Sequence, residues 1–172
     1  YAERGIPIVG LEPSCVYTLR DEWQGMLPKA ETAVLREPVL GFAEFLARED
    51  KAGRLDLKLQ GPWKKALVHG HCHEKAFGGF GDVQKALGLV PGLNVAGIES
   101  SCCGMAGAFG YEAEHYDVSQ RMGELGVLPA ARAATADTLL VADGTSCRQQ
   151  IRDGAGREAV HLARALQSAL AP

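Results

Sequence analysis

Several features that would assign a sequence quickly to a class are missing here. No apolar run in the 172 residues reaches the roughly 18 that a membrane-spanning helix needs, so we expect no integral membrane segment. The net charge of -3 leaves no basic excess, which argues against a general nucleic-acid binder. The Gly-x-Gly-x-x-Gly nucleotide fingerprint, the P-loop lysine and the His-Glu-x-x-His zinc-protease motif are also missing.

The N-terminal residues show no secretory leader. Tyr1-Ala2-Glu3 begins the chain without a charged segment followed by an apolar one. We therefore expect a cytoplasmic protein, with peripheral attachment at the inner face of the membrane as an alternative. The missing initiator methionine suggests that the chain is part of a longer protein.

Cysteine is present in an odd number, without the features of a disulfide framework. Such frameworks belong to short secreted chains with an even cysteine count. In a reducing compartment, clustered cysteines are more often metal ligands or redox groups. The five cysteines are Cys15, Cys72, Cys102, Cys103 and Cys147.

Apolar patterning predicts an α/β fold. Short buried runs alternate with amphipathic segments, which indicates a parallel sheet with helical crossovers. The expected strands are residues 6–10, 65–69, 93–98 and 137–142. The expected helices are 37–48, 82–89, 111–125, 128–134 and 158–170, and residues 51–62 are expected to form a loop or hairpin.

Every cysteine position follows directly on an expected strand. In open α/β sheets, binding sites form in the crevice outside the carboxyl ends of the strands. Cysteines that are far apart in the sequence would therefore converge at one edge of the sheet.

The chain also contains a short sequence pattern that occurs twice. Residues 14–21 and 146–153 share the pattern Ser-Cys-x-x-x-(Leu/Ile)-Arg-Asp, each after a strand and an acidic residue. A duplicated half-domain accounts for this match. We expect residues 1–25 to be the tail of a first repeat, 26–64 a connecting helix and loop, and 65–172 a complete, Rossmann-like second repeat.

The Cys102-Cys103-Gly104 segment is the most specific indication of a metal or redox site. Adjacent residues of an extended chain point in opposite directions, so both thiols face one site only if the backbone turns sharply, which Gly104 permits. Neighbouring thiolates can bind different irons of an iron–sulfur cluster, whereas a lone zinc is served better by Cys-x-x-Cys spacing. There are two alternatives to metal binding by this pair. The cysteines could be two small buried residues of the core, or they could undergo thiol–disulfide exchange with each other.

Histidines and small residues flank the cysteines. His71 and His73 are candidates for hydrogen bonds around the site or for direct zinc ligation, against a plain surface role. His69 is expected to be a strand-end histidine with a satisfied ring. Gly104 and Gly107 would allow a cofactor close to the backbone, with free N–H groups that stabilise thiolate or sulfide charge.

These residues resemble the cysteine-rich CCG domain. That domain occurs in the B subunit of heterodisulfide reductase, the iron–sulfur subunit of glycolate oxidase, the C subunit of anaerobic glycerol-3-phosphate dehydrogenase and the C-terminal part of fused FAD-linked D-2-hydroxyacid dehydrogenases of the D-lactate type. The phrases most similar to the fused group are Glu12-Pro13-Ser14-Cys15, Gly70-His71-Cys72-His73 and Cys102-Cys103-Gly104-Met105-Ala106-Gly107.

The resemblance implies a cofactor and partners. It implies a [4Fe–4S] cluster, or zinc as the alternative, with the ligands Cys72, Cys102, Cys103 and Cys147. Cys15 would match the last cysteine of a preceding repeat and is an additional candidate ligand. The fuller family pattern ends Cys-x-x-Cys, but here glutamine stands at position 150.

The implied function is electron transfer in a flavin-linked dehydrogenase. FAD would be bound by a flavin domain or subunit outside this chain. The electron acceptor would be a quinone or another redox protein. The chain alone is then not expected to turn over substrate.

Overall fold

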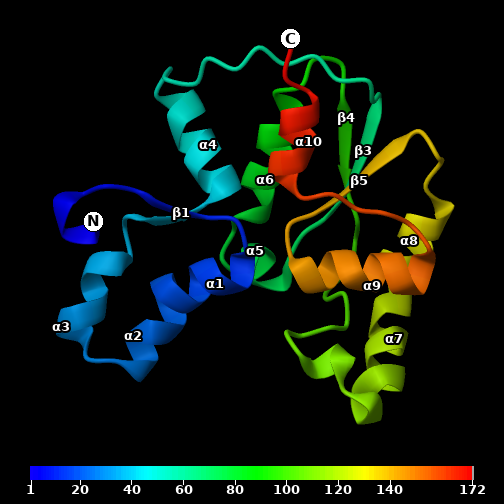
Figure 1. Ribbon diagram of the computed structural model, residues 1–172, viewed down its shortest axis with the longest axis horizontal. Helices are drawn as coiled ribbons and strands as arrows, with labels where there is room; N and C mark the ends of the chain where they lie inside the picture. The colour runs from blue at the N-terminus through cyan, green and yellow to red at the C-terminus, as the bar shows by residue number, and fades with distance from the viewer. Residues whose placement is uncertain (172) are drawn as a thin grey trace.

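The structure, a computed structural model, describes residues 1–171 of the chain. It contains two sheets of parallel strands, which are connected by helices (Figure 1). One sheet has two strands in the order β1-β2, and the other has three in the order β4-β3-β5. All pairings between these strands are parallel, which confirms the predicted fold class. The strands are β1 (Ile8–Gly10), β2 (Val39–Gly41), β3 (Lys65–His69), β4 (Asn94–Gly97) and β5 (Thr138–Ala142).

Ten α-helices are assigned within the described residues. In the N-terminal part they are α1 (Pro13–Tyr17), α2 (Trp23–Met26), α3 (Lys29–Thr32) and α4 (Phe42–Lys51), with a π-helical turn, Thr18–Glu22, between the first two. The others are α5 (Cys72–Ala76), α6 (Phe80–Gly88), α7 (Tyr116–Glu124), α8 (Val127–Ala133), α9 (Thr145–Ala155) and α10 (Leu162–Ser168). None of them is long and apolar enough to cross a membrane.

The three-stranded sheet separates two apolar layers. Alternate residues of a strand point to opposite faces, so Leu139 and Val141 of β5 face one layer while Leu140 and Ala142 face the other. Helices α4, α6 and α10 cover the first face, and α8 and α9 cover the second (Figure 1). Cys103 and Cys147 belong to the second layer. That layer therefore reaches the edge of the sheet where the cysteines lie.

The N-terminal segment docks on the rest of the chain through polar contacts near that edge. Glu12 Oε2 accepts hydrogen bonds from the backbone N–H and the hydroxyl of Thr145, both at 2.9 Å. His161 Nε2 lies 2.8 Å from the carbonyl oxygen of Leu11. These contacts hold β1 and α1 against the starts of α9 and α10, although more than 130 residues separate them in sequence.

Three local expectations differ from the structure. The helix expected over 37–48 is wrong at its start, because Val39 pairs with Ile8 in a parallel ladder and the helix begins only at Phe42. The helix expected over 111–125 is broken into two 3-10 turns followed by α7, and the one expected over 158–170 begins at Leu162. Helix α9 was not expected at all. The division of the chain into two repeats stays a prediction.

Candidate metal centre

Four of the five cysteines line one cavity of about 450 Å³. Cys72 is the first residue of α5 and Cys147 lies in the first turn of α9, while Cys102 and Cys103 lie in the loop after β4. The cavity therefore sits where β3, β4 and β5 end. Because these strands are parallel, their carboxyl ends meet at the same edge of the sheet.

The four thiols lie in a row along this cavity. Cys72 neighbours Cys102, Cys102 neighbours Cys103, and Cys103 neighbours Cys147, each close enough to shift the pKa of the next. All five cysteines are free thiols, so no disulfide joins the adjacent pair. Cys103 and Cys147 are buried and Cys72 is exposed, so the row runs from the interior to the mouth of the cavity.

The neighbouring thiols shift one another's pKa in opposite directions. Interaction with Cys103 and Cys72 lowers the pKa of Cys102, with help from the backbone N–H groups of Gly104 and Ala106. Interaction with Cys103 lowers the pKa of Cys147 to about 5, and the neighbouring His69 contributes to this lowering. The same interactions raise the pKa of Cys72 and Cys103. The thiolate is the form that binds metals, and a lowered pKa favours it at Cys102 and Cys147.

A sharp turn brings both members of the adjacent pair to the cavity. Gly104 has φ +96°, and a Cβ there would lie 2.1 Å from the carbonyl oxygen of Ser119. Its N–H donates to Cys102 Sγ at 3.3 Å. Gly107 also lines the cavity at φ +68°, but nothing lies within 4 Å of the Cβ it lacks. Of the two predicted glycines, Gly104 thus directly contacts a thiol.

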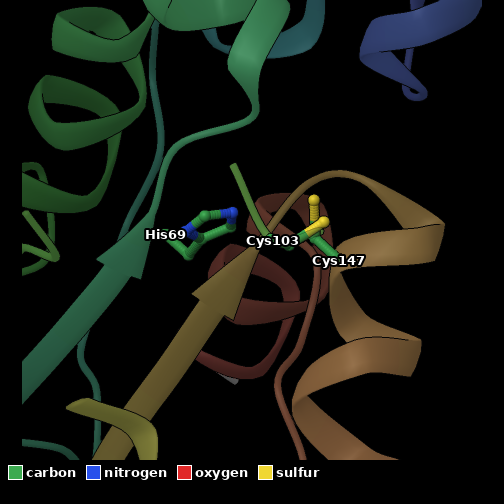
Figure 2. Close-up of side chains that lie close together, drawn as sticks. All are labelled: His69, Cys103 and Cys147. Carbon is green, nitrogen blue, oxygen red and sulfur yellow. The ribbon is translucent and has the colours of Figure 1, made fainter. Parts of the chain in front are cut away.

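His69 lies deep in the site, where sequence reasoning assigned it no role. It is the last residue of β3 and is 1% exposed. Its Nδ1 is 3.0 Å from Ser100 Oγ, while Nε2 has no hydrogen-bond partner among the described residues. One ring nitrogen and the sulfurs of Cys103 and Cys147 all lie within 4.8 Å of one another (Figure 2). This group of three could bind a metal.

His71 and His73 line the cavity in different ways. His71 is buried and caps α5, where its Nδ1 accepts from the N–H of His73 at 3.3 Å. Its Nε2 lies 3.5 Å from Ser14 Oγ, and burial lowers the pKa of this histidine. His73 is half-buried and its Nε2 lies 3.9 Å from a Glu22 carboxylate oxygen. His71 thus holds the Cys72 helix in place, in addition to facing the cavity.

Two buried carboxyl groups lie close together, Glu74 in the Cys72 helix and Asp143 directly after β5. Glu74 Oε2 accepts from the N–H of His71 at 3.0 Å, which completes the cap. Burial, together with the charge of Asp143, raises the pKa of Glu74 to about 8. Asp143 accepts from the N–H of Leu162 at 2.8 Å and lies 3.6 Å from His161. These groups position helices and do not line the thiol cavity.

Cys15 lies apart from the other thiols. It is exposed on α1 and lines a separate open hollow with Ser14, Thr18 and Leu19. Ser14 and Thr18 also line the thiol cavity, so Cys15 stands beside its rim. The structure therefore does not bring Cys15 into the row of four thiols.

Gln150 occupies the position where the fuller CCG pattern has its second cysteine. It is buried, and its Nε2 donates to the carbonyl oxygens of Cys103 and Ser119 at 3.0 and 3.1 Å. A third bond of 3.1 Å goes to the Ser119 hydroxyl. The side chain thus ties α9 to the loop that carries the adjacent thiols.

We expect Gln150→Leu to lower the free energy of unfolding by about 2–3 kcal/mol. Leucine keeps the side-chain volume but leaves buried oxygens without their donor. Urea denaturation of the metal-free protein measures this change. Gln149→Leu is the matched control, because the hydrogen bonds of Gln149 lie at the exposed surface, and it should change stability by less than about 0.5 kcal/mol. Equal effects of the two variants would contradict the role given to Gln150.

The comparisons with known proteins relate this α/β chain to oxidoreductases. The chain is 30% identical over 168 residues to the C subunit of anaerobic glycerol-3-phosphate dehydrogenase from Escherichia coli K12, covering 98% of this chain and 41% of that protein. It is 30% identical over 170 residues to D-2-hydroxyglutarate dehydrogenase of the same strain, covering 96% and 16%. The Pantoea ananatis D-2-hydroxyglutarate dehydrogenase is 29% identical over 166 residues, covering 96% and 16%.

These relatives confirm the resemblance to dehydrogenases of two groups in which the CCG domain occurs. They support an oxidoreductase-related domain. The chain spans about two fifths of the glycerol-3-phosphate dehydrogenase relative and about one sixth of the D-2-hydroxyglutarate dehydrogenases. No family model matches the chain, and no solved structure does.

Proposed function

We propose that the chain is the iron–sulfur electron-transfer domain of a flavin-linked D-2-hydroxyacid dehydrogenase of the lactate or glycolate type. The observation that carries the proposal is the row of four thiols lining one cavity at the ends of three parallel strands. The similarity to D-2-hydroxyglutarate dehydrogenases supports the substrate class.

The donor set fits an iron–sulfur group. Four thiols from three separate strand ends surround a cavity, and adjacent thiolates can serve different irons. Cys72, Cys102, Cys103 and Cys147 would hold the cluster. When bound, a [4Fe–4S] cluster accepts and releases single electrons at a potential that the protein tunes.

The chain's own residues would control that potential. Burial of Cys103 and Cys147 keeps water from the inner sulfurs, and the Gly104 N–H donates to Cys102. The exposed thiol of Cys72 marks the side from which a redox partner can approach.

The proposed division of labour balances electrons. Oxidation of a 2-hydroxyacid to the 2-oxoacid releases two electrons and two protons, which FAD takes up in a flavin domain or subunit outside this chain. The electrons then leave through this domain to a quinone or another redox protein. The complex would work in the cytoplasm, or at the inner face of the membrane.

A second candidate function is a zinc-binding module that docks onto partner domains of the same oxidoreductases. The compact group of His69, Cys103 and Cys147 favours this alternative, because a structural zinc takes such nitrogen and sulfur ligands. In that case the metal would hold the fold together and carry no electrons.

Metal and sulfide analysis of anaerobically prepared protein separates the two candidates. We expect about four iron and about four acid-labile sulfide per chain, with a visible spectrum that is bleached by reductant. The same reconstitution on urea-unfolded chain is the control for iron bound without a site. About one zinc and no sulfide, even after reconstitution, would contradict the electron-transfer proposal.

A further inference from the structure

The deepest part of the cavity holds a nitrogen donor that the four-cysteine ligand set leaves unused. His69 is 1% exposed, and its Nε2 has no hydrogen-bond partner among residues 1–171. A buried polar atom without a hydrogen-bond partner destabilises the fold, so this nitrogen is expected to have a partner in the functional state.

The ring is held so that this nitrogen faces sulfur. Nδ1 lies 3.0 Å from Ser100 Oγ, on the loop that leads to Cys102. When Nδ1–H donates to that hydroxyl, the lone pair of Nε2 is free for a metal. Metal-binding histidines usually have this arrangement, because the hydrogen bond at the other ring nitrogen sets both tautomer and orientation. Figure 2 shows the imidazole of His69 opposite the sulfurs of Cys103 and Cys147.

The spacing of the three donors matches a single metal atom. Nitrogen and sulfur ligands of one tetrahedral ion lie about 3.6–3.8 Å from one another, given bond lengths of about 2.0–2.3 Å. The three ligand atoms here are already within 4.8 Å of one another. Each donor comes from a different segment, β3, the loop after β4, and α9.

We infer that His69 is a metal ligand, whose Nε2 binds the same metal atom as Cys103 and Cys147. The inference rests on the proposed function in one respect, that Cys103 and Cys147 bind metal. The metal atom is a single divalent ion or one iron of a cluster, since both take nitrogen and thiolate ligands. A neutral imidazole in place of a thiolate leaves the centre less negative, as in iron–sulfur centres of higher potential.

Titration of the anaerobic, reduced chain with Co²⁺ tests the inference without enzyme activity. Sulfur-to-cobalt charge-transfer bands report thiolate ligation, and competition with a chelator gives the affinity. We expect His69→Asn to weaken Co²⁺ binding by more than about 100-fold, because asparagine can keep the bond to Ser100 but lacks the Nε2 donor. Ser100→Ala should cost about 10-fold, as a positioning residue does. His115→Asn is the matched control: His115 lies outside the cavity, in a group with Glu112 and Glu114 that has no thiol, so the sulfur-to-cobalt bands should stay as in the wild type.

Two further variants keep the result interpretable. His69→Cys supplies a thiolate at the same place, so it should recover binding and strengthen the charge-transfer bands, which a purely structural histidine would not do. Cys15→Ser, at the exposed thiol outside the cavity, should change Co²⁺ affinity by less than about 3-fold. If His69→Asn binds as tightly as the wild type, a site made of thiolates alone replaces the one inferred here.

Parallel iron and sulfide analysis of the wild type separates failure of the inference from failure of the proposed function. About four iron and sulfide with a His69-independent Co²⁺ site overturns the inference alone. His69-dependent Co²⁺ binding without iron or sulfide supports the inference and overturns the electron-transfer proposal. A wild type that binds neither cobalt nor iron overturns both.

Discussion

Cys103→Ser is expected to remove the metal centre, lowering bound metal to less than about one tenth of the wild-type content. Cys103 occupies the middle of the thiol row, next to both Cys102 and Cys147. A serine hydroxyl does not ionise near neutral pH and is a poor ligand for a soft metal, so the inner part of the site would lose a donor. Iron, zinc and sulfide contents of the variant, prepared anaerobically beside the wild type, measure the loss.

Cys15→Ser is the matched control for this prediction. Cys15 is exposed and lines a hollow separate from the thiol cavity, so its replacement should leave the metal content within about 10% of wild type. Circular dichroism of both metal-free variants checks that each still folds. Loss of metal in Cys15→Ser alone would mean that the assignment of residues 1–25 to a preceding repeat is wrong.

The placement of the thiols follows from simple patterns in the sequence. Buried runs such as Lys65–His69 predict strands, and crossovers between parallel strands bring their carboxyl ends together. Cys72, Cys103 and Cys147 each follow such a run, so their convergence could be expected without any coordinates. The strand 65–69 matches the prediction at both ends, and β4 and β5 match to within one residue.

The same reasoning could not predict that His69 faces the thiols with a ring nitrogen that lacks a hydrogen-bond partner among the described residues. Alternation places Leu67 and His69 on one face of β3, but it does not say which ring nitrogen is satisfied. That depends on Ser100, which reaches Nδ1 from the loop after β4. The sequence does show a histidine at a strand end, two residues before a His-Cys pair. Strand patterning alone does not tell whether such a histidine binds a metal.

Helix α9 was missed because its apolar residues are few. Gln149, Gln150 and Arg152 give the segment a polar composition, and the helix is fixed mainly by tertiary contacts. Ile151 packs into the second core layer, Gln150 bonds to the Cys103 loop, and Glu12 caps the first turn from 133 residues away in sequence. Long-range contacts of this kind override local propensity, which is why sequence patterns do not show them.

Gly104→Ala is expected to lower the free energy of unfolding by about 3–5 kcal/mol and to weaken metal binding with it. The backbone at Gly104 has φ +96°, which costs an L-residue about 1–3 kcal/mol. The new methyl group would also lie 2.1 Å from the carbonyl oxygen of Ser119, a buried residue of α7, so backbone must move. Overpacking of this kind costs a further 1–3 kcal/mol or so.

Gly107→Ala provides the matched control in the same loop. Its φ of +68° carries a similar backbone penalty, but no atom lies within 4 Å of the added Cβ, so a loss of about 1–2 kcal/mol is expected. Urea denaturation of the metal-free variants gives both values. A difference of less than about 1 kcal/mol between them would show that the loop yields easily. In that event the sharp turn at Gly104 would not be what holds Cys102 and Cys103 on one cavity, and the metal affinity of Gly104→Ala should stay near that of the wild type.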